Sequence, residues 1–96
     1  MADRDNSREL AECFGRNVFG ARRRADLSQE ELRIRAALHR TEIGMLERGI
    51  RLPRLDTIIK VAGGVEIDPG DLLTGIAWVP NDRHPSGGEF TTREAD

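Results

Sequence analysis

Apolar side chains recur at helical spacing along two long stretches of the chain, each flanked by polar or basic residues. In the first stretch they lie three or four residues apart, which predicts a helix over residues 8–24 with one inward face. The same period predicts a shorter helix over residues 55–62, ended early by Gly63 and Gly64. The apolar positions are Leu10, Phe14, Val18, Ala21 and Ala25 in the first helix, and Leu55, Ile58, Ile59 and Ala62 in the second.

Two helix-start signals lie close together in residues 27–49, between these stretches. Ser28 and Glu31 have the spacing of a capping box, in which the hydroxyl and the carboxylate each accept a backbone amide proton. A second helix is expected to start at His39 and to end at Gly49, which supplies a left-handed stop. The connector between the two helices is too short for an antiparallel hairpin, so they should cross steeply as a helix-turn-helix.

The two sides of this helix pair differ in polarity. A short helix at about residues 40–48 with a largely polar or basic outer face, braced from behind by a neighbour, suits insertion into a DNA major groove. The inward residues are Leu32, Ala36, Leu38, Ile43 and Leu46. The outward residues are Arg33, His39, Arg40, Thr41, Gly44, Met45 and Arg48.

The C-terminal third carries weaker signals. Asp68 as cap and Pro69 at the first helical position predict a fifth helix that closes the core. The extension over residues 75–96 is either a short β-hairpin, with Trp78 on one strand and Phe90 on the other, or an unstructured tail. An isolated hairpin is marginal in water, so it would have to pack on the helices or on a partner chain.

From its length and the distribution of its charges, we predict that the chain has a tail at residues 1–7, one domain at residues 8–74 and the extension at residues 75–96. The net charge of −2 divides unevenly. Residues 8–60 hold 12 Lys or Arg and 8 Asp or Glu, a net charge of +4, whereas the rest of the chain holds 3 and 9, a net charge of −6. The excess of positive charge thus lies in the segment that contains the proposed helix-turn-helix, although surfaces that face only solvent also carry clusters of charged residues.

Several function classes are disfavoured. No apolar run is long enough for a membrane span, the first residues lack the apolar core of a signal peptide, and the single Cys13 excludes an internal disulfide framework, which together indicate a cytoplasmic protein. Cys13, His39 and His84 lack the spacing of metal ligands, and the chain has no Gly-rich phosphate loop. We therefore expect no enzyme activity, no cofactor and no metal.

The segments LSQEEL, LHRTEI, LERG, LPRLDTIIKVA and IDPGDLL resemble the Cro/CI-type (XRE, lambda-repressor-like) helix-turn-helix family, over about residues 14–73 and without gaps. The resemblance implies an all-α, five-helix domain that binds double-stranded DNA sequence-specifically as a transcriptional regulator of repressor-like type. One helix reads only a few base pairs, so a homodimer on two half-sites about 34 Å apart is expected, with the fifth helix and the Trp78 segment as its interface.

The same resemblance implies which residues contact DNA. Arg40 and Thr41 occupy positions that usually touch base edges; arginine pairs naturally with guanine, and Met45 could meet a thymine methyl while Gly44 lets the backbone approach. Arg40 contacting phosphate alone is the alternative. The residues expected at phosphates are Ser28, Gln29, His39, Arg48, Arg51 and Arg54.

Arg22 and Glu47 match an ion pair of the family that joins the first helix to the second helix of the motif, so they are expected to be structural.

Two rival functions remain open. An antitoxin or a restriction-controller protein would use the same DNA-binding face, with the C-terminal extension contacting a protein partner. A protein-interaction adaptor would use this fold without DNA.

Overall fold

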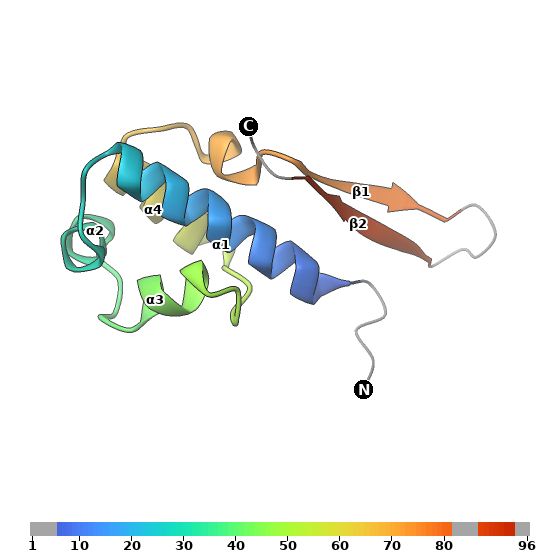
Figure 1. Ribbon diagram of the computed structural model, residues 1–96, viewed down its shortest axis with the longest axis horizontal. Coiled ribbons are helices and arrows are strands. Elements are labelled where there is room, and N and C mark those ends of the chain that lie inside the picture. Colours follow the sequence, from blue (N-terminus) through green and yellow to red (C-terminus); the bar gives the residue numbers. More distant parts are fainter. Residues whose placement is uncertain (1–5, 82–86, 94–96) are drawn as a thin grey trace.

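The computed structural model describes residues 6–81 and 87–93 (Figure 1). Within these residues four α-helices come first, α1 (Ser7–Arg24), α2 (Gln29–Ala36), α3 (Glu42–Glu47) and α4 (Leu55–Val65), followed by a 3-10 helix, η1 (Pro69–Leu73). The chain then forms an antiparallel hairpin of β1 (Ile76–Pro80) and β2 (Gly88–Thr92). The helices form one body, and the hairpin extends away from it past the start of α1 (Figure 1).

The hydrophobic core is formed by one face of each helix. Most of the predicted inward residues are buried, but Ala25, Leu55 and Ile59 are exposed, with 74% of Leu55 and 52% of Ile59 accessible. Helix α4 is apolar on both sides, so the spacing of its apolar residues could not show which side faces α2 and η1. The core residues are Phe14, Val18, Ala21, Leu32, Ala36, Ile43, Leu46, Val61, Ala62, Val65 and Leu72.

The predicted capping box at the start of α2 is confirmed. The Glu31 amide donates to Ser28 Oγ at 3.0 Å, and the Ser28 amide donates to Glu31 Oε1 at 2.7 Å. That backbone hydrogen bond holds the pKa of the Glu31 carboxyl below its ordinary value. Asp26, just before the cap, has a φ of 60°. The capping contacts at the entry into α2 are therefore local ones.

Close approach of α1 and α3 depends on two glycines. A Cβ on Gly15 would lie 2.3 Å from the Leu46 carbonyl oxygen, so the backbones of α1 and α3 are in direct contact there. Gly49 has a φ of 72°, as predicted for the stop after α3, and a Cβ there would lie 2.8 Å from the Cα of Glu12. These contacts seat α3 on α1 (Figure 1).

Two helix predictions for the second half of the domain were wrong. Helix α4 does not end at Gly63 and Gly64 but continues to Val65, because Gly64 lies against α2, where a Cβ would be 2.7 Å from Leu32 Cδ1. The predicted fifth α-helix is instead the five-residue 3-10 helix η1, and Asp68 stands at its N-cap position but makes no side-chain capping hydrogen bond. The domain therefore has four α-helices among its described residues rather than five.

The hairpin alternative holds for the C-terminal extension. Trp78 pairs with Phe90 across the strands, and their rings meet edge to face with centroids 5.0 Å apart. Asn17 of α1 ties η1 to that helix, since its Nδ2 donates to the carbonyl oxygens of Leu72 and Thr74, each at 2.9 Å. The hairpin itself is held by Asn6, at the start of α1, whose Nδ2 donates to the Phe90 carbonyl oxygen at 2.7 Å. Of the predicted N-terminal tail, residues 1–5 lie outside the described residues, and α1 begins at Ser7.

None of the described helices combines the length and apolar character needed to cross a bilayer.

Candidate nucleic-acid interface

The turn before α3 presents the predicted reading residues. We expected the helix to start at His39, but α3 begins at Glu42, and Arg40 and Thr41 lie in the turn that leads into it. The Glu42 amide donates to the His39 carbonyl oxygen at 2.9 Å, and His39 Nδ1 lies 3.2 Å from Thr41 Oγ1. The Thr41 amide donates to His39 Nδ1 at 3.4 Å, so His39 supports the turn, and the helix begins later than predicted.

Five of the predicted DNA-contact residues share one surface. A shallow cavity of about 260 Å³, here called the Arg40 cavity, is lined by Gln29, Arg40, Thr41, Gly44 and Arg48. Gln29 comes from the first turn of α2, whereas the others come from α3 and its flanking residues. The fold thus brings a predicted phosphate contact of one helix beside the predicted base contacts of the next.

The other predicted contacts do not line this cavity; they are Ser28, His39, Met45, Arg51 and Arg54. Met45 is half-buried and does not line it. Gly44 is open, because a Cβ there would meet only Gln29 Oε1, at 3.9 Å. Ser28 uses its hydroxyl to cap α2. Gly44 is half-buried, but the space beside its Cα is open, which is what close approach to a base edge requires.

Arg22 and Glu47 form the predicted ion pair. Arg22 Nε lies 2.6 Å from Glu47 Oε2 and Nη2 lies 3.0 Å from Oε1, with 9% and 5% of the two side chains accessible. Arg22 Nη1 also donates to the Leu27 carbonyl oxygen at 2.8 Å. One bidentate contact therefore joins α1 to the end of α3, and a third hydrogen bond ties both to the entry of α2.

Gln29 extends this network, which the sequence analysis did not predict. Its Nε2 donates to Glu47 Oε1 at 2.9 Å, so a single carboxylate orients both Arg22 and Gln29. The spacing of 18 residues between Gln29 and Glu47 leaves no local signal for this contact. The second Nε2 proton of Gln29 is available to a ligand at the Arg40 cavity.

Two of the flanking arginines are paired with carboxylates of the chain. Arg51 Nη1 lies 3.0 Å from Glu42 Oε1, and Arg54 Nη2 lies 3.3 Å from Asp56 Oδ2. The Arg54 and Asp56 side chains are 84% and 53% exposed, so this surface pair contributes little free energy and a phosphate can replace the carboxylate at small cost. Arg51 is 48% exposed, but its partner Glu42 is only 16% exposed, so that pair is less open to solvent.

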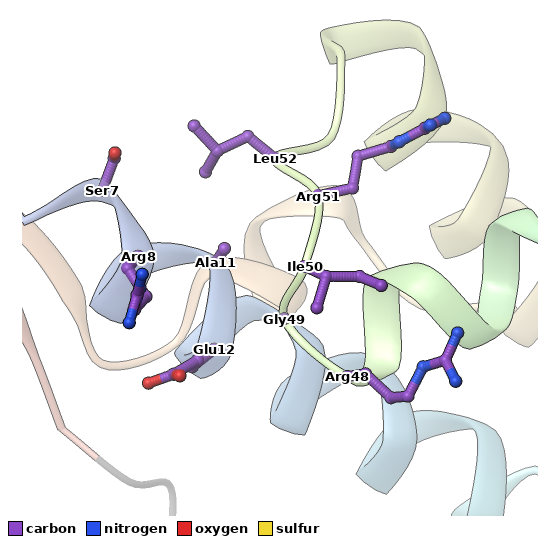
Figure 2. A pocket seen from close by; sticks show the side chains of 9 residues that line it. All are labelled: Ser7, Arg8, Ala11, Glu12, Arg48, Gly49, Ile50, Arg51 and Leu52. Atoms are coloured by element: carbon purple, nitrogen blue, oxygen red, sulfur yellow. The ribbon is translucent and has the colours of Figure 1, made fainter. Parts of the chain in front are cut away.

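A larger hollow of about 610 Å³ lies next to this surface, between the first turns of α1 and the connector from α3 to α4 (Figure 2). Arg48 borders both hollows. Figure 2 shows Arg48 and Arg51 extending from the connector on the side opposite Arg8. The sequence did not single out Arg8 or Glu12 for this region, since their contact with the connector depends on how α1 packs.

Among the described residues, no three His, Cys, Asp or Glu side chains gather as a metal-binding group.

Comparison with known proteins gives one consistent picture. Residues 21–72 match the helix-turn-helix family model. The chain is 41% identical over 61 residues to control protein C.BamHI of Bacillus amyloliquefaciens, covering 62% of this chain and 75% of that protein. The restriction-modification controller protein C.AhdI from Aeromonas hydrophila superposes with a TM-score of 0.65 at 34% identity, covering 67% of this chain and 97% of that one. A hypothetical transcription factor, NHTF from Neisseria, superposes with a TM-score of 0.65 at 27% identity, covering 76% and 84%.

Proposed function

This chain belongs to the Cro/CI-type (XRE) helix-turn-helix family of DNA-binding transcription regulators, and on that premise we propose that the Arg40 cavity is the surface that meets its operator. The observation that carries the proposal is the convergence of Gln29, Arg40 and Gly44 on one exposed surface, from two helices. The start of α3 enters the major groove, and α2 approaches the adjacent backbone.

In this proposal, the residues that contact bases lie in the turn before α3 and in α3 itself. Arg40 donates two hydrogen bonds to guanine O6 and N7, a contact worth about 1 to 3 kcal/mol of discrimination. Thr41 bonds a neighbouring base edge, and Met45 contacts a thymine methyl. Gly44 lets the backbone come close, since no Cβ intervenes.

Phosphate contacts set the register of the protein on the duplex. The amides at the start of α2, together with Ser28 and Gln29, hold one phosphate at the positive helix end. His39 and Arg48 hold the backbone beside the cavity. Arg51 and Arg54 exchange their own carboxylate partners for phosphates farther along the strand.

A binding selection from random duplexes tests this assignment. Arg40→Ala should bind more weakly and lose preference at one base pair, whereas Lys60→Ala, which removes the same charge from α4, should keep the full sequence preference. An unaltered preference in Arg40→Ala would show that Arg40 does not read bases.

Salt dependence tests the phosphate contacts. The logarithm of the binding constant should fall with the logarithm of salt concentration with a slope near −0.9 for each phosphate contact, so Arg48→Ala should lower the slope by about one. A binding constant insensitive to salt would favour the adaptor function instead.

The chain acts as a homodimer in this proposal, with η1 and the Trp78 segment at the interface. Apolar side chains exposed there support it, with 41% of Leu73 and 46% of Trp78 accessible. Sedimentation with and without operator DNA measures the association. A monomer at all concentrations, free and DNA-bound, would contradict it.

The finer role that we propose is control of restriction-modification genes. Its support is the similarity to C.BamHI at 41% identity and to C.AhdI over 97% of that chain. The antitoxin alternative predicts that a second small protein co-purifies through the C-terminal extension. A selected operator sequence found upstream of a neighbouring endonuclease or methyltransferase gene would favour the controller role.

A further inference from the structure

Hydrogen bonds at the two ends of the hairpin determine which of its backbone groups face outward. The Arg93 amide donates to the Gly75 carbonyl oxygen at 2.9 Å, and the Asn81 amide donates to the Gly87 carbonyl oxygen, also at 2.9 Å. Opposed residues of an antiparallel pair alternate between bonded and non-bonded positions. Every second residue of β1 therefore points its backbone groups away from β2, and these residues are Ile76, Trp78 and Pro80.

The two outer edges of the hairpin differ. On the β2 edge, Asn6 bonds both backbone groups of Phe90, with Nδ2 to O at 2.7 Å and N to Oδ1 at 2.8 Å. On the β1 edge, no hydrogen bond joins the outward amides of Ile76 and Trp78 to any part of the chain that the structure describes. An unpaired strand edge is a template for another strand. The chain thus closes part of one edge itself and leaves the other open.

We propose that the open edge of β1 pairs with the β1 edge of a second copy of this chain, which makes a four-stranded antiparallel sheet about a two-fold axis. This inference rests on the homodimer proposed above and limits its interface to the β1 edge around Trp78, without η1. With Trp78 opposite its counterpart, each copy donates the Ile76 and Trp78 amides to the Pro80 and Trp78 carbonyl oxygens of the other. The edge is self-complementary, as a two-fold interface requires. Pro80, which has no amide proton, ends the register.

The character of β1 favours a second copy as the occupant. β1 has no charged side chain, so like charges do not meet at the axis. Trp78 and Val79 are 46% and 47% exposed, an apolar surface that pairing would cover. A two-stranded hairpin alone is marginally stable, and the added strands would support it.

The placement of the helices leaves room for this pairing. Helix α1 contacts β2 more extensively than β1, so the helical body lies on the side away from the open edge. The hairpin extends beyond the body (Figure 1). Because the two β1 strands run antiparallel, the two helical bodies come to opposite ends of the shared sheet.

Trp78→Pro and Trp78→Ala separate the backbone edge from the side chain. Both remove the ring, but only proline removes the outward amide, which takes no part in pairing between β1 and β2. In sedimentation equilibrium of the full chain, Trp78→Pro should dimerise roughly tenfold or more weakly than Trp78→Ala. Equal dimerisation constants would overturn pairing through β1.

Cysteine cross-linking tests the register without proline. In a Cys13→Ala background, Trp78→Cys places opposed Cα atoms about 5.5 Å apart, within disulfide range. Mild oxidation should link this variant into a dimer and leave Thr91→Cys, on β2, unlinked. Absence of the cross-link in a protein that sediments as a dimer would overturn β1 pairing and leave the homodimer intact.

A third variant locates any other interface. Loss of the dimer in Ile59→Lys, on the exposed side of α4, but not in Trp78→Pro would overturn the β1 interface. A wild-type chain that stays monomeric with and without DNA would overturn both the homodimer and its proposed surface.

Discussion

Removing the Glu47 carboxylate while Arg22 stays in place is expected to cost about 3 to 5 kcal/mol of the free energy of unfolding. The two side chains are only 5% and 9% exposed, so water cannot replace the lost partner. The Arg22 guanidinium donates two hydrogen bonds to the Glu47 carboxylate and one to the Leu27 carbonyl oxygen. Without Glu47 it keeps only the bond to Leu27. Small domains are stable by about 5 to 15 kcal/mol, so Glu47→Ala should be close to unfolding.

Urea denaturation followed by circular dichroism measures this cost, and two further variants sharpen it. Glu66→Ala breaks an exposed pair with Arg35, whose side chains are 77% and 44% accessible, and should cost less than about 1 kcal/mol. The double variant Arg22→Met with Glu47→Leu removes both charges and should recover most of the stability.

DNA binding then separates the two roles of Glu47. The double variant should fold but bind operator DNA more weakly, because Gln29 has lost the carboxylate that orients it. If Glu47→Ala costs no more than Glu66→Ala, or if the double variant is as unstable as the single one, the reasoning from a buried charge is refuted. Full DNA affinity in the double variant would remove the positioning role.

Three further predictions follow from local geometry. Gly15→Ala should lower the free energy of unfolding by about 1 to 3 kcal/mol, because the new Cβ would lie 2.3 Å from the Leu46 carbonyl oxygen. Gly63→Ala is the control and should not lower it, because nothing lies within 4 Å of that position. Similar denaturation midpoints for the two variants would contradict this reasoning. Ala37→Gly should stabilise the domain by roughly 0.5 to 1 kcal/mol, because Ala37 has a φ of 55°, and an unchanged melting temperature would count against it. Because the pKa of its carboxyl is lowered on folding, Glu31 contributes stability that is complete above the ordinary pKa of 4.5 and is lost as pH falls through the lower folded pKa. Glu31→Gln should therefore lose less stability than wild type in acid melts, and parallel curves would disprove this.

Much of the helix-turn-helix could be predicted from the sequence because its signals are local. The Ser28 and Glu31 capping box and the Gly49 stop involve residues at most a few positions apart. The inward faces of α1 and α2 were also largely predictable, since each helix has one apolar side. The roles of Arg40 and its neighbours at DNA stay predictions, which the selection experiment tests.

Tertiary packing decided what local signals could not. Helix α4 is apolar on both sides, so only its contact with α2 through Gly64 determined that Leu55 and Ile59 face outward. The hairpin forms because distant residues support it, with Asn6 bonded to Phe90 across 84 positions of the chain. Likewise Gln29 meets Glu47 only once α2 and α3 have crossed. Helix caps and the spacing of apolar residues depend on neighbouring residues, so the sequence alone predicts them. The contacts between remote segments form only when the chain has folded.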